Sequence, residues 1–109
     1  MLSKKAFQDL IVCRFIDAYV ELHGEINTNV ITTQFQLHRV TASRILGQYQ
    51  KKKPSNLHYD SSKKRYVKGY TFEKVFLINE SSFLYLNAIE LVYSDRVSAS
   101  DIKKGRFSK

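Results

Sequence analysis

The chain has little of what several classes of protein need. Its 109 residues contain one cysteine, Cys13, so no internal disulfide can form and no second thiolate is available to a metal. The three histidines, His23, His38 and His58, lack the spacing of metal ligands. Apolar runs are shorter than the ~18 residues that a membrane-spanning helix needs, and polar residues interrupt the N-terminus where a signal peptide would be apolar. We therefore expect a cytoplasmic protein with no metal, no cofactor and no membrane partner.

A catalytic constellation is also missing. There is no Ser/His/Asp spacing, no glycine-rich phosphate loop and no metal cluster. Four acidic residues are expected on the first helix, largely on its solvent face: Asp9, Asp17, Glu21 and Glu25. The sequence therefore predicts that the chain is not an enzyme and has no evident small-molecule ligand.

Acidic residues are scarce between Arg39 and Lys74, where two acids accompany ten basic residues. This excess of eight equals the whole net charge of +8, so the rest of the chain is balanced. A basic block of this kind is typical of a surface that binds a polyanion such as DNA. A solvated basic face without a partner is the alternative that composition alone leaves open.

Apolar periodicity predicts three helices in the first half of the chain. Spacing of three and four from Phe7 to Leu22 predicts a helix over residues 4–22, with Ser3 as its N-cap and Gly24 as its stop. Asn27 is placed to cap a short second helix that ends near Phe35. After a turn at residues 36–38, a third helix runs from residue 39 or 40 to residue 51, before Pro54. Its inward residues are predicted to be Ala42, Ile45, Leu46 and Tyr49.

The second half changes character. Residues 57–59 and 66–67 are rich in β-formers and flank a polar, basic tip at residues 60–65, which predicts a hairpin. A final helix is predicted over residues 81–93. The expected fold is mainly α with a small β-hairpin wing: a winged helix-turn-helix plus a C-terminal helix. We expect a DNA-binding domain at residues 1–76, a dimerising helix at 77–94 and a flexible basic tail at 95–109.

Two short helices joined by a three-residue turn form a helix-turn-helix, whose second helix reads the major groove. Arginine bonds guanine edges and hydroxyl side chains reach bases or phosphates, so the outward positions of the third helix are the predicted base readers: Arg39, Val40, Thr41, Ser43, Arg44 and Gln48. The missing side chain of Gly47 would let this helix approach DNA closely, although a tolerated surface glycine is the alternative. Two basic clusters are the predicted phosphate contacts: Lys51, Lys52, Lys53, Lys63, Lys64 and Arg65.

Several stretches together resemble the N-terminal winged-helix domain of WYL-domain transcriptional regulators, the BrxR- and CapW-like type that represses bacterial anti-phage defence islands. The resemblance covers residues 10–76 and rests on residues 14–16, 24–27, 35–38, 42–43, 49–50 and, most specifically, 54–67. It implies a DNA-binding head without the WYL domain, as in a repressor encoded by a phage, plasmid or defence island. The family usually has glycine where Gln36 stands in the turn.

The last predicted helix is apolar around most of its circumference, so it must be buried on more than one side. A second copy is the simplest cover, which predicts a homodimer on an inverted repeat. The predicted interface consists of Phe83, Leu84, Leu86, Ile89, Leu91 and Tyr93. Complete burial within a monomer is the alternative.

The leading prediction is a sequence-specific double-stranded DNA-binding regulator, most simply a repressor. The first alternative is a protein-interaction or structural module that docks through its last helix and binds nucleic acid non-specifically. The second is single-strand or RNA binding through Tyr59, Tyr66 and Tyr70, for which strand spacing favours core packing over base stacking.

Overall fold

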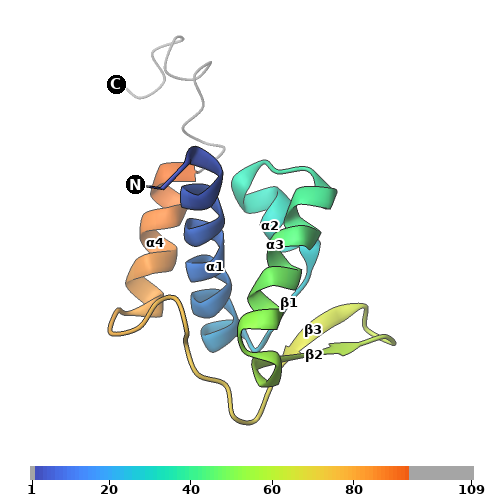
Figure 1. Cartoon of the computed structure of the whole chain (residues 1–109). Coiled ribbons are helices and arrows are strands. Elements are labelled where there is room, and N and C mark those ends of the chain that lie inside the picture. Colours follow the sequence, from blue (N-terminus) through green and yellow to red (C-terminus); the bar gives the residue numbers. More distant parts are fainter. Residues whose placement is uncertain (1, 94–109) are drawn as a thin grey trace, which may run out of the picture.

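The computed structural model describes residues 2–93, which form four α-helices and a three-stranded antiparallel sheet (Figure 1). In chain order the elements are α1 (Lys4–His23), β1 (Glu25–Ile26), α2 (Thr28–Phe35), α3 (Arg39–Lys52), a 3₁₀ turn (Pro54–Asn56), β2 (Leu57–Asp60), β3 (Arg65–Lys68) and α4 (Ser82–Tyr93). The predicted fold class is confirmed. The tail predicted at residues 95–109 lies outside the described residues.

Side-chain caps fix the helix ends where the sequence predicts them. Ser3 accepts a hydrogen bond from the Ala6 N–H at 3.1 Å, and Asn27 accepts one from the Val30 N–H at 3.1 Å. Gly24 ends α1 with a left-handed φ of 79°. Gln36 ends α2 with a left-handed φ of 57°, so this glutamine keeps the backbone conformation that glycine adopts most easily.

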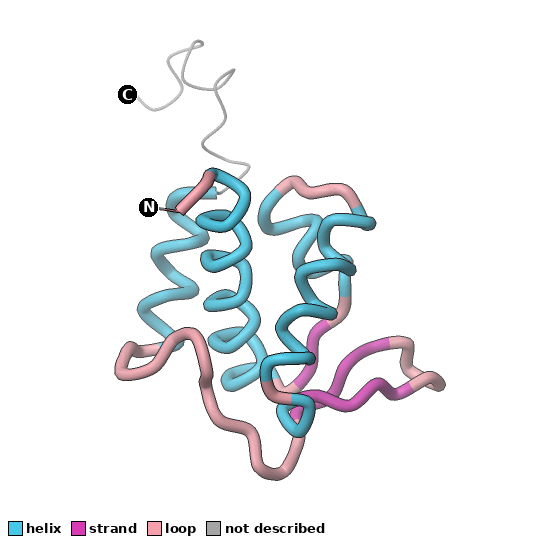
Figure 2. Tube along the Cα trace, viewed as in Figure 1, coloured by secondary structure: helices cyan, strands magenta, loops and turns pink. Residues whose placement is uncertain are grey.

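The sheet contains a strand that the sequence pattern did not predict. β1 pairs with β3, and β3 pairs with β2, so the strand order is β1-β3-β2 (Figure 2). Glu25 lies opposite Val67 and Ile26 lies opposite Tyr66, while Leu57 to Asp60 run opposite Lys68 to Arg65. The hairpin is therefore tied to the segment between α1 and α2, and the wing and the helix-turn-helix form one unit.

α1 lies between α4 on one side and the α2–α3 pair on the other (Figure 1). Buried side chains from all four helices meet around it, including Phe15, Ile31, Ile45 and Tyr49. The predicted inward face of α3 is confirmed, since its four residues are all buried. Phe7 and Leu22 follow the helical spacing but are about half exposed, so they do not belong to the core.

α4 packs along α1 through one face. Ile89 is 6% exposed and belongs to the core, and Tyr93 packs edge-on against Phe35 with ring centroids 4.9 Å apart. Ile89 therefore cannot lie in a dimer interface, which corrects the sequence prediction. The opposite face stays open, with Leu84, Leu91 and Val92 exposed. Among residues 2–93, no helix is long and apolar enough to cross a membrane.

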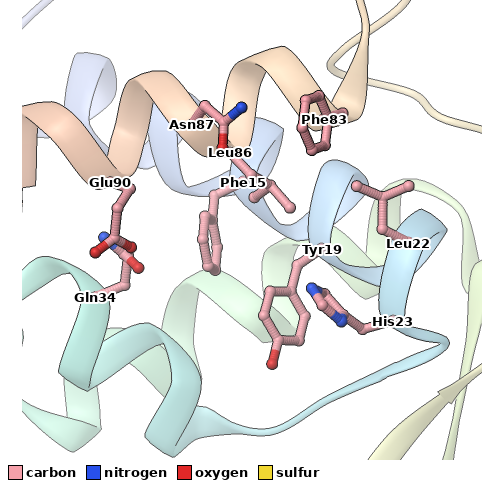
Figure 3. A pocket seen from close by; sticks show the side chains of 9 residues that line it. All are labelled: Phe15, Tyr19, Leu22, His23, Gln34, Phe83, Leu86, Asn87 and Glu90. Carbon is pink, nitrogen blue, oxygen red and sulfur yellow. The ribbon is translucent and has the colours of Figure 1, made fainter.

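A shallow pocket of about 340 Å³ opens between α1, α2 and α4 (Figure 3). Phe15, Tyr19 and Leu86 form its walls, while the rings of Tyr19 and His23 lie against each other with centroids 4.3 Å apart. Phe83 and Leu22 stand at its rim and are largely exposed.

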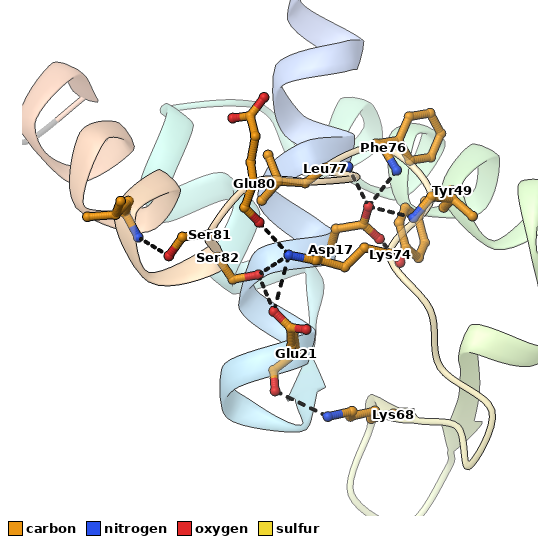
Figure 4. A network of polar contacts seen from close by, with 12 residues as sticks. Asp17, Glu21, Tyr49, Lys68, Lys74, Phe76, Leu77, Glu80, Ser81 and Ser82 are labelled. Atoms are coloured by element: carbon orange, nitrogen blue, oxygen red, sulfur yellow. Dashed lines mark hydrogen bonds and ion pairs between the residues drawn. The ribbon is translucent and has the colours of Figure 1, made fainter.

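The structure also corrects the prediction for Asp17, which is fully buried and does not lie on the solvent face of α1. One carboxylate oxygen accepts hydrogen bonds from three consecutive backbone N–H groups, those of Val75, Phe76 and Leu77, at 2.6 to 2.9 Å (Figure 4). The other oxygen accepts a short hydrogen bond from the Tyr49 hydroxyl. Asp17 thus joins α1, α3 and the loop that leads to α4.

Candidate nucleic-acid interface

The outer face of α3 is the first part of the candidate site. The four buried residues of α3 hold it against α1 and α2, so the opposite side chains point to solvent. Val40 is 81% exposed, and Arg39, Ser43 and Lys51 are exposed as well. A Cβ built on Gly47 would meet nothing within 4 Å, so no contact inside the protein requires glycine there.

A groove separates α3 from the wing and forms the second part of the site. It has a volume of about 330 Å³ and is bounded by the first turn of α2, by α3 and by the hairpin. Arg39 and Ser43 enter it from α3, and Lys64 enters it from the wing. The structure thus brings together two predicted base readers and one predicted phosphate contact. Asn27, Thr28, Tyr59 and Tyr66 complete the lining, and the sequence pattern did not predict the first two as DNA-binding residues.

The wing tip presents its lysines on a structured turn. The Asp60 carboxylate accepts hydrogen bonds from the Ser62 N–H and hydroxyl and from the Lys63 N–H, at 2.7 to 3.2 Å. These bonds, led by the one from the Ser62 hydroxyl, hold the pKa of Asp60 below its usual value. Lys64 adopts a left-handed φ of 56°, and both Lys63 and Lys64 are exposed. The carboxylate therefore shapes the tip, which leaves two lysines pointing to solvent.

Three predicted site residues are held in ion pairs. Arg44 donates two hydrogen bonds to the Asp9 carboxylate, at 2.9 and 3.2 Å, and this contact raises the pKa of Arg44. Arg65 pairs with Glu25 of β1, and Lys53 pairs with Glu73. None of these acids was predicted as a partner, because each lies far away in sequence.

These ion pairs, together with the groove, divide the predicted DNA-binding residues into two groups. Arg44 and Gln48 lie on the flank of α3 that faces the N-terminal end of α1, where Gln48 borders a pocket with Leu10 and Phe76. Arg39, Ser43 and Lys64 meet instead at the groove. Among residues 2–93, no acidic side chain pairs with Arg39, Lys51, Lys52 or Lys64. These four basic side chains lie on α3 and at the wing tip.

The tyrosines of the wing are more exposed than the strand spacing predicted. Tyr70 is fully exposed and Tyr59 is half exposed, so core packing is wrong for both. Tyr66 packs against the core, and its ring meets that of Tyr59 edge-on at 5.0 Å. Tyr59 therefore forms part of the groove wall between α3 and the wing.

The buried Cys13 is not a reactive group. Burial, assisted by the nearby Asp9 and Asp17 carboxylates, raises the pKa of its thiol to about 12. Within residues 2–93, no three residues of the His, Cys, Asp and Glu types lie close enough together to hold a metal ion.

Comparison with known proteins agrees with this geometry. A family model described as the BrxR transcriptional regulator winged helix-turn-helix domain matches residues 10–91. The match begins in α1 and ends in α4, so it includes the helix-turn-helix, the wing and most of the last helix. No curated protein matches the sequence significantly. The chain belongs to the family of BrxR transcriptional regulator winged helix-turn-helix domains, which makes it a DNA-binding regulator.

Proposed function

We propose that this chain binds a specific double-stranded DNA sequence as a homodimer and represses transcription from it. α3 enters the major groove and reads bases through Arg39, Val40, Thr41 and Ser43. Lys51, Lys52, Lys63 and Lys64 contact phosphates on either side. The observation that carries the proposal is the basic groove between α3 and the wing, where Arg39 and Lys64 lie on opposite walls.

The ion pairs refine the assignment of roles. Arg44, Lys53 and Arg65 each form an ion pair with an acidic residue of the same chain. They are therefore less available to contact DNA than Arg39 and Lys64. Arg44 fixes α3 against α1, and Arg65 fixes the wing against β1. Gln48 remains a candidate base reader at the edge of α3.

Repression is the simplest regulatory outcome of such a complex. A domain bound to duplex DNA blocks polymerase when its site overlaps a promoter. An inverted repeat is the matching target for two copies, because a twofold protein presents the same α3 to each half-site. A DNA-binding regulator must reach the genome, which in bacteria lies in the cytoplasm, so this proposal is consistent with the predicted cytoplasmic location.

The test is a comparison of two substitutions on two DNA targets. A preferred duplex is first selected from a random pool, and affinity is then measured by fluorescence anisotropy on that duplex and on a scrambled one, across salt concentrations. Arg39→Ala should cost about 1–3 kcal/mol on the selected duplex and much less on the scrambled one. Lys64→Ala should weaken both equally and lower the salt slope by about 1.

Lys5→Ala is the matched charge control, because Lys5 is exposed at the start of α1, away from the groove. It should leave both affinities close to those of the unchanged protein. Equal losses on the two duplexes from Arg39→Ala would overturn base reading by this residue. Tighter binding to single-stranded DNA than to any duplex would favour stacking on Tyr59 and Tyr70 instead.

A further inference from the structure

The exposed face of α4 carries an apolar stripe that nothing in the described chain covers. Leu84, Ala88 and Leu91 are spaced four and three residues apart on the side of α4 away from Ile89, and all three are exposed. Spacing of this kind forms the seam between two packed helices. The exposed fractions are 66% for Leu84, 73% for Leu91, 70% for the adjacent Val92 and 63% for Phe83.

The charge distribution makes this stripe suitable for a second copy of the same chain. Glu90 is the one charged residue within Ser82–Tyr93, and it borders the pocket toward α1 and α2. The basic residues of α3 and the wing lie on the other side of α1 (Figure 1). Two copies can therefore approach through α4 without bringing their positive surfaces together.

The area also fits a small dimer interface. A specific contact buries at least about 1,000 Å² in total, or about 500 Å² from each copy. Leu84, Leu91 and Val92 are each about two-thirds exposed or more, and together with Ala88 they offer a patch on the order of that size. Isolated apolar side chains on a surface need no partner, but a contiguous patch of this extent indicates one.

We infer that α4 packs antiparallel against α4 of a second copy, with the twofold axis passing beside Ala88. This inference rests on the homodimer proposed above and specifies its contact. The small side chain of Ala88 lets the two helices approach closely, and Leu84 of each copy contacts Leu91 of the partner subunit.

A cysteine placed next to a twofold axis lies close to the same cysteine of the partner subunit. Disulfide cross-linking therefore tests the proposed contact. Ala88→Cys should form a disulfide-linked dimer under mild oxidation, because a close helix pair brings the two Cα atoms within the about 4.4–6.8 Å that a disulfide spans. Asn87→Cys is the matched control, since it is exposed on the same helix but turned about 100° away from Ala88, so it lies off the proposed twofold axis. It should remain largely unlinked on a non-reducing gel, as should the unchanged protein, whose Cys13 is buried.

A second variant tests the contact without cysteine chemistry. Leu91→Glu should convert the dimer to a monomer in multi-angle light scattering while its helical circular dichroism stays unchanged, because Leu91 is not a core residue. Its affinity for a single half-site should equal that of the unchanged protein, and its affinity for the full inverted repeat should fall by 10-fold or more.

The outcomes separate this inference from the proposed function. A wild-type dimer in which Ala88→Cys does not link, or which Leu91→Glu does not dissociate, would overturn the α4 contact and leave a homodimer with another interface. A wild-type chain that is monomeric at all concentrations and on DNA would overturn both the contact and the homodimer, and it would favour a different protein as the cover for α4. DNA binding by the basic groove is measured independently in every case.

Discussion

The hydroxyl of Tyr49 and the carboxylate of Asp17 form a buried hydrogen bond between α3 and α1. The same hydroxyl accepts a hydrogen bond from the Asn56 side chain at 3.0 Å, and Asn56 in turn holds the backbone of Glu73. These contacts, together with those of Asp17 to residues 75–77, set the position of α3 relative to the rest of the domain (Figure 4). Burial, followed by the bond to Asp17, raises the pKa of Tyr49.

Replacing Asp17 by asparagine should destabilise the protein strongly. The asparagine NH₂ group would have to face either the three backbone N–H donors or the Tyr49 hydroxyl, which leaves buried groups unpaired. We expect a loss of about 2–3 kcal/mol in the free energy of unfolding by urea titration. Tyr49→Phe removes two hydrogen bonds, the one to Asp17 and the one from Asn56, but keeps the three backbone bonds of Asp17, and should cost about 1–2 kcal/mol. A loss from Asp17→Asn no larger than that from Tyr49→Phe would contradict the central role of the carboxylate.

Cys13 should be unreactive in the folded protein. Its thiol is buried and its pKa is raised to about 12, so the nucleophilic thiolate is scarce at neutral pH. Iodoacetamide at pH 8 should label the protein fully in urea and hardly at all without it, as measured by intact mass. Rapid labelling of the native chain would show that the site opens easily, and it would compromise the cysteine cross-linking experiment.

Stability should fall as the solution becomes alkaline. The pKa of Cys13 is raised from 9.0 to about 12 and that of Tyr85 from 10.0 to about 12, both chiefly by burial. The unfolded chain therefore releases these protons first, so their contribution to stability is complete below pH 9 and is lost progressively as the pH rises toward 12. Urea midpoints between pH 7 and 10.5 should decline, and the decline should be shallower in Cys13→Ala. An unchanged slope in that variant would mean that other groups dominate.

Gly47 and Gly69 should respond to alanine in opposite ways. Gly47→Ala places a Cβ in open space within α3, so the helix should gain about 1 kcal/mol of stability. A Cβ at Gly69 would lie 2.0 Å from the Ser55 carbonyl oxygen, so Gly69→Ala should destabilise the wing base markedly. If α3 lies close to DNA at Gly47, the stabilised variant will bind the selected duplex more weakly. Unchanged affinity would make Gly47 a tolerated surface glycine.

The Arg44–Asp9 ion pair should contribute mainly to the packing of α3 against α1, and less to direct contact with DNA. Its side chains are partly exposed, so a double-mutant cycle with alanine at both positions should give a coupling energy of about 0.3–1 kcal/mol. Asp9→Ala frees the guanidinium beside the outer face of α3 and should strengthen binding to duplex DNA. Weaker binding by Asp9→Ala would show that the pair positions α3, and that Arg44 serves DNA recognition only through that position.

Local patterns predicted the elements well, because caps, periodicity and breakers act within a few residues. Ser3, Asn27 and Gly24 mark helix ends at the predicted positions, and the hairpin lies where its polar tip indicated. β1 escaped prediction because two residues carry no alternation, and its partner strand lies about 40 residues away.

Long-range pairing explains the other differences. Asp17 and Glu21 are four residues apart, which is the usual spacing of two residues on one solvent-exposed helix face. The backbone groups that bind Asp17 lie 58 to 60 residues further along the chain, so the sequence near Asp17 does not reveal them. The acids that hold Arg44, Arg65 and Lys53 are likewise 20 to 40 residues distant. In α4, apolar residues on all sides left no signal to show that Ile89 faces the core while Leu84 and Leu91 face outward.

The hydrogen bonds that Asp17 accepts from residues 75–77 also limit where this domain can be joined to other domains in evolution. The carboxylate holds backbone N–H groups, so proline cannot stand at positions 75, 76 or 77 because it has no N–H to donate. The buried Leu77 also requires an apolar side chain at its position. A fusion that joined a different effector directly after the wing would leave a buried carboxylate without its donors. Domains exchanged by recombination should therefore be joined beyond α4, so that residues 75–77 and the core residue Ile89 are inherited together with the DNA-binding head.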